Sequence, residues 1–131
     1  MAVENVPKNL TDRYGILDVV DDDGVLASVK GLVEKPKPVA APSTLSIIGR
    51  YILQASVFAE LDKQEKGSGN EIQLTDAMAR TIPQVPFHGF RFEGTRYDCG
   101  NRLGYIEANL AFALERTDMK ERVKEIIAKY S

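Results

Sequence analysis

The chain has 131 residues, 44% hydrophobic and 27% charged, which is the composition of one ordinary globular domain. With 17 basic and 19 acidic residues its net charge is −2, so neither a nucleic acid nor a membrane surface is expected as a partner. The single cysteine excludes an internal disulfide, and no apolar run approaches the roughly 18 residues of a membrane span. Because the first residues lack a basic region followed by an apolar stretch, a cytoplasmic location is expected.

The first part of the chain shows strand patterns. Residues 13–20 and 26–36 are apolar and β-branched, and the turn signal DDDG between them predicts a hairpin. Pro36 ends the second strand and is expected to keep Lys35 extended. Residues 44–53 are apolar on both faces, which predicts a strand that is covered on both sides.

Helical patterns dominate the later part of the chain. Residues 55–64 and 74–82 have amphipathic spacing, with Thr75 or Asp76 available to cap the second helix. Short strands are expected in residues 85–98. From Asn101 onward apolar residues recur at helical spacing in two segments, so two helices should close the chain. This order of elements predicts an α/β fold.

Two nucleotide- or metal-binding patterns fail on inspection. The stretch VVDDDG would need an acidic residue at the twelfth position of a calcium loop, and Lys30 stands there. The stretch GSGNEI has Ile72 where a dinucleotide loop needs its third glycine.

Cys99 and His88 could form a thiol and its base, but nothing marks a third group that would orient them. A lone cysteine is more often a small buried hydrophobic residue.

Several charged residues and one glycine stand at positions typical of ligand sites. Glu34 and Lys35 end an apolar strand at an expected sheet edge, where α/β sheets bind ligands. Gly15 begins a strand, where a glycine costs stability unless something approaches the backbone closely. Each has a purely structural alternative: solvated strand-end charges for the first pair, a first-turn helix acid for Glu71, and a helix cap for Asp98.

Together these residues belong to a recognisable set of motifs. The segments RYGI, GLVEKPKP, APSTLSIIGRYIL, GNEIQLTDAMA and RYDCGNRLGY stand in the order and spacing found in bacterial UTP–glucose-1-phosphate uridylyltransferases. Over residues 1–131 the chain resembles the C-terminal half of the catalytic domain of that family. The resemblance implies part of a Rossmann-like nucleotide-diphospho-sugar transferase fold, with a mixed sheet, flanking helices and two C-terminal helices.

The resemblance also implies roles for individual residues. Glu34 and Glu71 would accept hydrogen bonds from glucose hydroxyls, which suits a group that only accepts. The backbone at Gly15 would lie against the hexose, and Ile47 would contact it through its main chain. Lys35 would be the catalytic cation that holds the sugar phosphate, because a compact point charge offsets the repulsion between two anionic reactants.

The same resemblance implies a metal and a reaction. Asp98 would be one of two carboxylates on a catalytic Mg²⁺, a cation that prefers oxygen ligands. A glucose 1-phosphate oxygen would attack the α-phosphorus of UTP, giving UDP-glucose and pyrophosphate by positioning and charge neutralisation. The family's glycine-rich nucleotide loop, its uracil contacts and its other metal-binding aspartate belong to an N-terminal half that is absent here. The chain alone is therefore expected to be inactive.

An α/β sheet without half of its strands is expected to keep an open edge and an apolar face. The isolated chain is therefore expected to self-associate, and the intact enzyme is expected to be a homo-oligomer. A non-catalytic sugar-phosphate-binding or oligomerisation module derived from the enzyme remains the alternative.

Overall fold

The structure, a computed structural model, describes residues 1–130, except for the side chain of Ser68. The chain separates into two compact units: unit 1 is Met1–Phe92, and unit 2 begins at Glu93. Among the described residues, no helix is long and apolar enough to cross a membrane.

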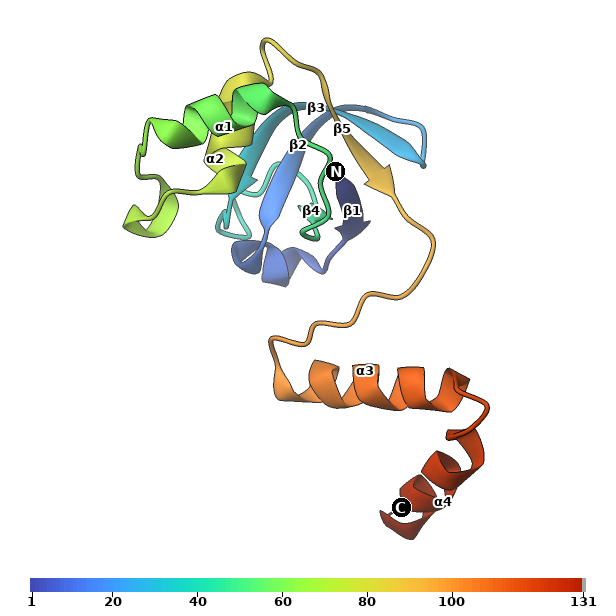
Figure 1. Ribbon diagram of the computed structural model, residues 1–131. Helices are drawn as coiled ribbons and strands as arrows, with labels where there is room; N and C mark the ends of the chain where they lie inside the picture. Colours follow the sequence, from blue (N-terminus) through green and yellow to red (C-terminus); the bar gives the residue numbers. More distant parts are fainter. Residues whose placement is uncertain (131) are drawn as a thin grey trace. The chain divides into compact units, whose positions relative to one another are not determined.

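Unit 1 is built on a mixed sheet that closes into a small barrel (Figure 1). The strand order is β1-β4-β2-β3-β5, and β5 pairs again with β1. The β1–β5 pair is parallel, whereas the other neighbours are antiparallel. The five strands are β1 (Ala2–Asn5), β2 (Gly15–Asp22), β3 (Leu26–Glu34), β4 (Leu45–Ile47) and β5 (Phe87–Arg91).

Helices accompany the sheet in unit 1 and make up most of unit 2. In unit 1, α1 and α2 pack on each other and α2 packs on β3 (Figure 1). In unit 2, α3 contacts α4. The predicted α/β class with a mixed sheet and two closing helices is confirmed. The helices are α1 (Ala55–Asp62), α2 (Leu74–Thr81), α3 (Arg102–Glu115) and α4 (Lys120–Tyr130), with 3-10 turns at Lys8–Arg13 and Ser68–Asn70.

The hydrophobic core of unit 1 joins the barrel to its helices. Val3 and Leu17 from the strands, and Val57, Ala77 and Met78 from α1 and α2, belong to one buried cluster. Each of these side chains is almost fully removed from water. Their burial is the main force that holds the two helices on the sheet, since each large apolar side chain contributes about 1.5–3 kcal/mol.

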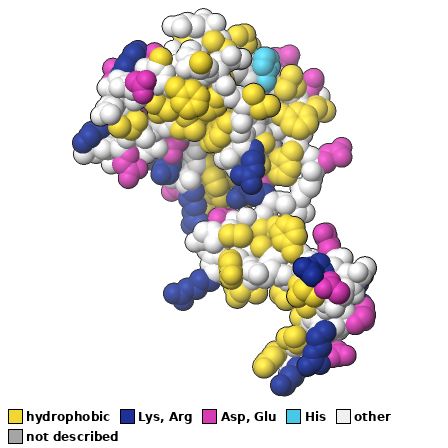
Figure 2. Space-filling model, viewed as in Figure 1, with side chains coloured by type: hydrophobic (Ala, Val, Ile, Leu, Met, Phe, Trp, Pro, Cys, Tyr) yellow, Lys and Arg dark blue, Asp and Glu magenta, His cyan; other side chains and the backbone are white. Residues whose placement is uncertain are grey.

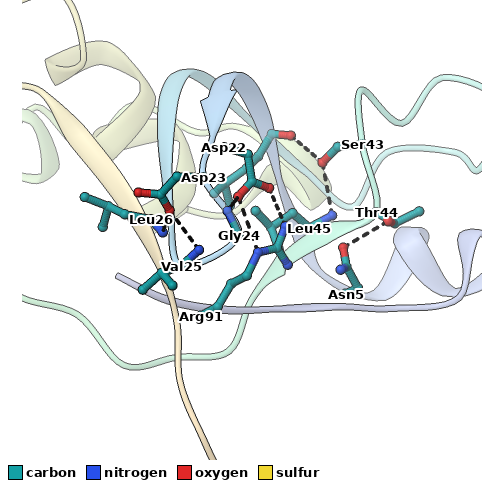
Figure 3. A network of polar contacts seen from close by, with 11 residues as sticks. Asn5, Asp22, Asp23, Gly24, Val25, Leu26, Ser43, Thr44, Leu45 and Arg91 are labelled. Atoms are coloured by element: carbon teal, nitrogen blue, oxygen red, sulfur yellow. Dashed lines mark hydrogen bonds and ion pairs between the residues drawn. The ribbon is translucent and has the colours of Figure 1, made fainter.

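The turn of the β2–β3 hairpin is held by the side chains of Asp22 and Asp23 (Figure 3). Gly24 adopts a φ of +90, and its amide donates to Asp22 Oδ1 at 3.0 Å. Asp23 Oδ1 accepts from the amides of Val25 and Leu26. The Arg91 guanidinium of β5 pairs with Asp22, and this bond holds the pKa of the Asp22 carboxyl below its usual value. The hairpin predicted from the DDDG signal is therefore confirmed, and its turn lies between Asp22 and Leu26.

A second set of side-chain bonds ties the proline-rich loop to the barrel (Figure 3). Ser43 Oγ donates to the carbonyl of Leu17 at 2.7 Å and accepts from the amide of Leu45 at 3.0 Å. The next residue, Thr44, donates to Asn5 Oδ1 at 3.2 Å. The loop thus delivers β4 to its place between β1 and β2.

Three expectations about the strands are wrong. β4 has three residues, because Gly49 turns to a φ of +77 soon after it ends. Only Phe87–Arg91 of the segment 85–98 forms a strand. The expected open edge is absent from the five described strands, because β1, which sequence patterns missed, fills the gap between β4 and β5.

Large apolar side chains are nevertheless exposed on both units (Figure 2). Val39 and Ile52 in unit 1 are 91% and 95% exposed. Leu103 and Tyr130, on the two helices of unit 2, are 79% and 80% exposed. Exposed apolar side chains are therefore present, although the five described strands have no open edge along which they could lie.

Gly89 on β5 should not tolerate a side chain. A Cβ there would stand 2.6 Å from Leu17 Cδ2 and 3.1 Å from both methyl groups of Val3, in the middle of the core. We expect Gly89→Ala to lower the free energy of unfolding by about 1–3 kcal/mol, because overpacking strains the neighbours. Urea denaturation followed by circular dichroism measures this change.

Gly31→Ala on β3 is the matched control. A Cβ at Gly31 would meet only Asp18, at 3.5 Å, so the substitution should be neutral or stabilising by about 0.5 kcal/mol. Equal effects of the two substitutions would contradict the packing that the barrel shows around Gly89.

Candidate functional site

Gly15, Glu34 and Ile47 meet at one end of the barrel. Gly15 opens β2 and pairs across the ladder with Glu34, the last residue of β3. A Cβ on Gly15 would stand 3.1 Å from Glu34 Oε2, 3.2 Å from Ile47 Cδ1 and 3.0 Å from Thr75 Oγ1. We call these four residues the Gly15 cluster. The close approach predicted at Gly15 exists, and side chains of the protein make it.

The cluster follows from the order of the strands. β4 lies beside β2, with Ser46 opposite Ile16, so the next residue of β4, Ile47, is carried to the start of β2. Thr75 comes from the first turn of α2 and is 6% exposed. The helix can approach the strand this closely because Gly15 has no side chain.

Glu34 is the acidic group of the cluster. Its side chain is only 10% exposed, and its Oε1 lies 3.7 Å from Lys35 Nζ, whose side chain is 49% exposed. Tyr51 lies near enough for this charge to act on it: burial raises the pKa of the Tyr51 hydroxyl, and the Glu34 carboxylate raises it further. The end of the barrel therefore offers a largely buried carboxylate that can accept hydrogen bonds.

Lys35 does not have the extended backbone that Pro36 was expected to impose. Its φ is +47, in the left-handed region that residues with a Cβ rarely adopt. The Lys35 amide donates to the carbonyl of Tyr14 at 3.0 Å, so the β2–β3 ladder continues one step beyond Glu34 and turns the chain there. Strain of this kind is commonly found at ligand-binding positions.

Glu71 lies on the segment that leads into α2. It follows the 3-10 turn Ser68–Asn70, is exposed, and accepts from Gln73 Nε2 at 3.1 Å. Thr75, four residues later in the chain, belongs to the Gly15 cluster. The segment that carries Glu71 is thus joined to the cluster through the start of α2, while Glu71 itself is not one of the residues at Gly15.

Asp98 lies in unit 2, at the turn before α3. Its Oδ1 accepts from the Gly100 amide at 3.0 Å, while its carbonyl accepts from Asn101 Nδ2 at 3.1 Å. The helix cap is Asn101, whose Oδ1 accepts from the Gly104 amide at 2.8 Å. A Cβ on Gly104 would stand 2.2 Å from the Asp98 carbonyl oxygen, so this turn needs glycine there. The alternative in which Asp98 caps α3 is therefore wrong.

The carboxylate of Asp98 is a candidate for a single metal bond. It is exposed, and Mg²⁺ commonly takes one or two protein carboxylates together with substrate phosphates. In the part of the chain that the structure describes, no group of three or more His, Cys, Asp or Glu side chains could hold a metal ion by itself. Asp98 is thus suited to be one ligand of a metal ion that is also bound by other groups, such as substrate phosphates.

Two residues of this region were missed or misinterpreted from the sequence. Thr75 or Asp76 was expected to cap α2, but the N-cap is Gln73 and the Thr75 hydroxyl faces Gly15. No sequence pattern marked Tyr51 as part of this region, apart from its place shortly after the short strand β4. Cys99 is exposed, so the expectation that a lone cysteine is a small buried hydrophobic residue is wrong here. His88 lies on the strand β5, as expected.

Comparison with known proteins identifies the family. The model for the nucleotidyl transferase family matches residues 1–115, so the chain belongs to that family. Its relatives include the UTP–glucose-1-phosphate uridylyltransferases of Komagataeibacter xylinus, 62% identical over 103 residues, and of Staphylococcus haemolyticus, 43% identical over 127 residues. The resemblance to this group of bacterial enzymes, inferred from the sequence motifs, is thereby confirmed.

Solved structures agree with this assignment. The UTP-bound UGPase from Acinetobacter baumannii matches 100% of this chain with a TM-score of 0.84 and 38% identity. A UDP-glucose pyrophosphorylase complexed with UDP-glucose matches 88% of the chain with a TM-score of 0.80 and 38% identity. These matches cover 45% and 44% of the solved chains. Likewise, the chain spans 36% and 44% of the two curated relatives, although 79% and 97% of this chain is matched.

The left-handed backbone at Lys35 should be measurable as strain. A residue with a Cβ pays about 1–2 kcal/mol in this conformation, whereas glycine does not. We expect Lys35→Gly to be more stable than Lys35→Ala by up to about 1 kcal/mol, because both remove the same half-exposed charge. Urea denaturation of the two variants tests this.

Lys37→Gly against Lys37→Ala is the control pair, two residues further on and without a left-handed backbone. A preference for glycine at both positions, or at neither, would contradict the assignment of strain to Lys35.

Proposed function

We propose that this chain provides the sugar-phosphate side of a uridylyltransferase, which converts UTP and glucose 1-phosphate to UDP-glucose and pyrophosphate. The observation that carries the proposal is the meeting of Gly15, Glu34 and Ile47 at one end of the barrel. Three residues that are separate in the sequence, and that the family resemblance implicates in hexose binding, are neighbours in space. The names of the relatives support the same reaction.

In this proposal the Gly15 cluster holds the hexose. The Glu34 carboxylate accepts hydrogen bonds from sugar hydroxyls, and its low exposure makes such bonds stronger than they would be in water. Gly15 and Ile47 offer main-chain contact, and Glu71 accepts from a further hydroxyl. Acceptor groups placed in this way orient a sugar without consuming a proton.

Lys35 is proposed to bind the phosphate of the sugar. Its ammonium is half exposed beside the Glu34 carboxylate, so it can turn toward an anion while it stays close to the hexose. Holding the phosphate lowers the repulsion that two anionic reactants would otherwise feel. Positioning and charge neutralisation are the main sources of rate enhancement in phosphoryl-type transfer.

Asp98 is proposed to supply one ligand to a Mg²⁺ ion shared with substrate phosphates. Its exposed carboxylate is held by the Gly100 amide at one oxygen. When bound, Mg²⁺ would neutralise the charge on the phosphates. The chain itself contributes the oriented carboxylate, because the turn through Asn101 and Gly104 fixes the backbone of Asp98.

We further propose that residues 1–131 correspond to the C-terminal half of the nucleotidyltransferase domain, and that the intact enzyme is a homo-oligomer. The chain spans 36% and 44% of two relatives, which supports a partial domain, and the motif resemblance supports its being the C-terminal half. Exposed apolar side chains on both units, such as Ile52 and Leu103, support the second, because apolar surface of this kind favours association.

Glucose 1-phosphate should bind weakly to this chain at the Gly15 cluster. We expect a titration followed by two-dimensional NMR to shift the amide signals of Gly15 and Ile47, without UTP present. Glu34→Gln should weaken the binding, since it removes the charged acceptor but keeps the shape of the side chain.

Asp21→Asn is the control, because it removes an exposed acid at the other end of β2. The sugar-binding proposal fails if glucose 1-phosphate shifts no signals near Gly15, or if Glu34→Gln and Asp21→Asn bind it equally well.

The role of Asp98 can be tested in a hybrid enzyme, in which this chain replaces the matching segment of the Komagataeibacter xylinus relative. We expect Asp98→Asn to lower turnover by orders of magnitude, with partial rescue by high Mg²⁺ or Mn²⁺, because it removes the charge that the metal needs. The melting temperature should hardly change, since Asn101 caps the helix.

Cys99→Ala is the matched control at the neighbouring position and should leave the rate nearly unchanged. Full activity of the Asp98→Asn hybrid would refute the metal role. An inactive hybrid built on the unaltered chain, which nevertheless binds glucose 1-phosphate, would favour the non-catalytic binding module instead.

A further inference from the structure

The carboxylate of Asp76 presses against the backbone at Gly67. A Cβ built on Gly67 would stand 1.6 Å from Asp76 Oδ2 and 2.8 Å from Asp76 Cγ, much closer than two such atoms can come. Only a glycine can therefore occupy this position while the carboxylate stays where it is. The contact joins the first turn of α2 to the loop that precedes it.

The loop on the other side of this contact is closed on itself and ends at Glu71. The Gly67 amide donates to the Glu71 carbonyl at 2.8 Å, and the Asn70 amide donates to the Gly67 carbonyl at 3.1 Å. Gly69 and Asn70 both have left-handed backbones, with φ of +73 and +61. Gly67 and Glu71 are thus the two ends of one tight turn. A displacement of the Gly67 backbone should therefore also shift the backbone of Glu71.

Asp76 is held firmly on its own side. Its neighbours along α2, Ala77 and Met78, are fully buried in the core of unit 1. Thr75, directly before it, lies against Gly15. Because the adjacent residues are fixed by packing, the backbone of Asp76 is held in place and its carboxylate meets Gly67 from there, whereas Gly67, Gly69, Asn70 and Glu71 of the turn are exposed.

We propose that Asp76 is a positioning residue that sets the turn carrying Glu71, and thereby the acceptor that Glu71 offers to the sugar. This inference rests on the proposed function for its last step only. The Asp76–Gly67 contact belongs to the same helix start that brings Thr75 to Gly15, so one helical turn places both sides of the sugar site. A purely structural first-turn acid would stabilise α2 and leave the turn unaffected.

Hydrogen exchange of the 131-residue chain tests the first step without any ligand. In Asp76→Ala we expect the amides of Gly67 and Asn70 to exchange faster by about tenfold. The Ala77 amide, which donates to the Gln73 carbonyl within α2, should keep its protection. Asp76→Asn keeps the shape of the contact and should behave like the unaltered chain.

Asp62→Ala, at the exposed last residue of α1, is the matched loss of an acid and should change neither set of amides. Equal acceleration in α2 and in the turn, or faster exchange in Asp76→Asn as large as in Asp76→Ala, would show that Asp76 acts only as a charge on its helix. Either result overturns the proposal.

A double-mutant cycle of Gly67 and Asp76 tests the same contact. Gly67→Ala should perturb the turn, because either the Asp76 carboxylate or the turn must move to make room for the Cβ. In the Asp76→Ala background the same change should cost less, and the backbone cost of alanine at residue 67 cancels between the two arms. Additive effects would mean that the two residues do not press on each other, which also overturns the proposal.

Titration with glucose 1-phosphate, followed by NMR, tests the second step. Asp76→Ala should weaken binding as much as Glu71→Ala does, and Asp76→Asn should restore it. A loosened turn with unchanged binding would refute the positioning role. If the unaltered chain binds no glucose 1-phosphate, the proposed function fails, whereas the exchange and cycle experiments still decide whether Asp76 sets the turn.

Discussion

The β2–β3 ladder is the constraint on which the rest of unit 1 depends. At one end the aspartate turn fixes the hairpin, and at the other Gly15 faces Glu34. Between them lies an irregularity around Val19, which adds twist without changing the register at either end. A slip by one residue would turn the buried Leu17 to the opposite face, so the buried core enforces the pairing that holds Glu34 beside Gly15.

Because Gly15 has no side chain, α2 can pack closely against the start of this ladder. Thr75 can approach because nothing projects from the strand, and Asp76, the next residue, rests on Gly67. A single helical turn therefore contacts the barrel on one side and the loop before Glu71 on the other. If the proposed function holds, the start of α2 contacts the end of the barrel that carries Glu34 and also sets the turn that carries Glu71.

Sequence patterns predicted those elements whose signals are local. The hairpin, α1, α2, α3 and α4 follow from turn residues and helical periodicity within each segment. β1 was missed because its four residues are a strand only through pairing with the distant β4 and β5. Lys35 was assigned an extended backbone by a local rule about proline, and a hydrogen bond to Tyr14 overrides that rule. The meeting of Gly15 with Thr75 likewise depends on tertiary packing, which no spacing in the sequence encodes.

The residues proposed for sugar and for metal depend on different parts of the fold. Glu34 is in place only while the barrel is closed, since its neighbours come from β2, β4 and α2. Asp98 is oriented by a turn of a few residues, in which Gly100, Asn101 and Gly104 supply the contacts. A perturbation of the barrel core should therefore disorganise the hexose contacts and leave the geometry around Asp98 intact. If the proposed function holds, the hexose contacts and the metal ligand are therefore each oriented by contacts within their own unit.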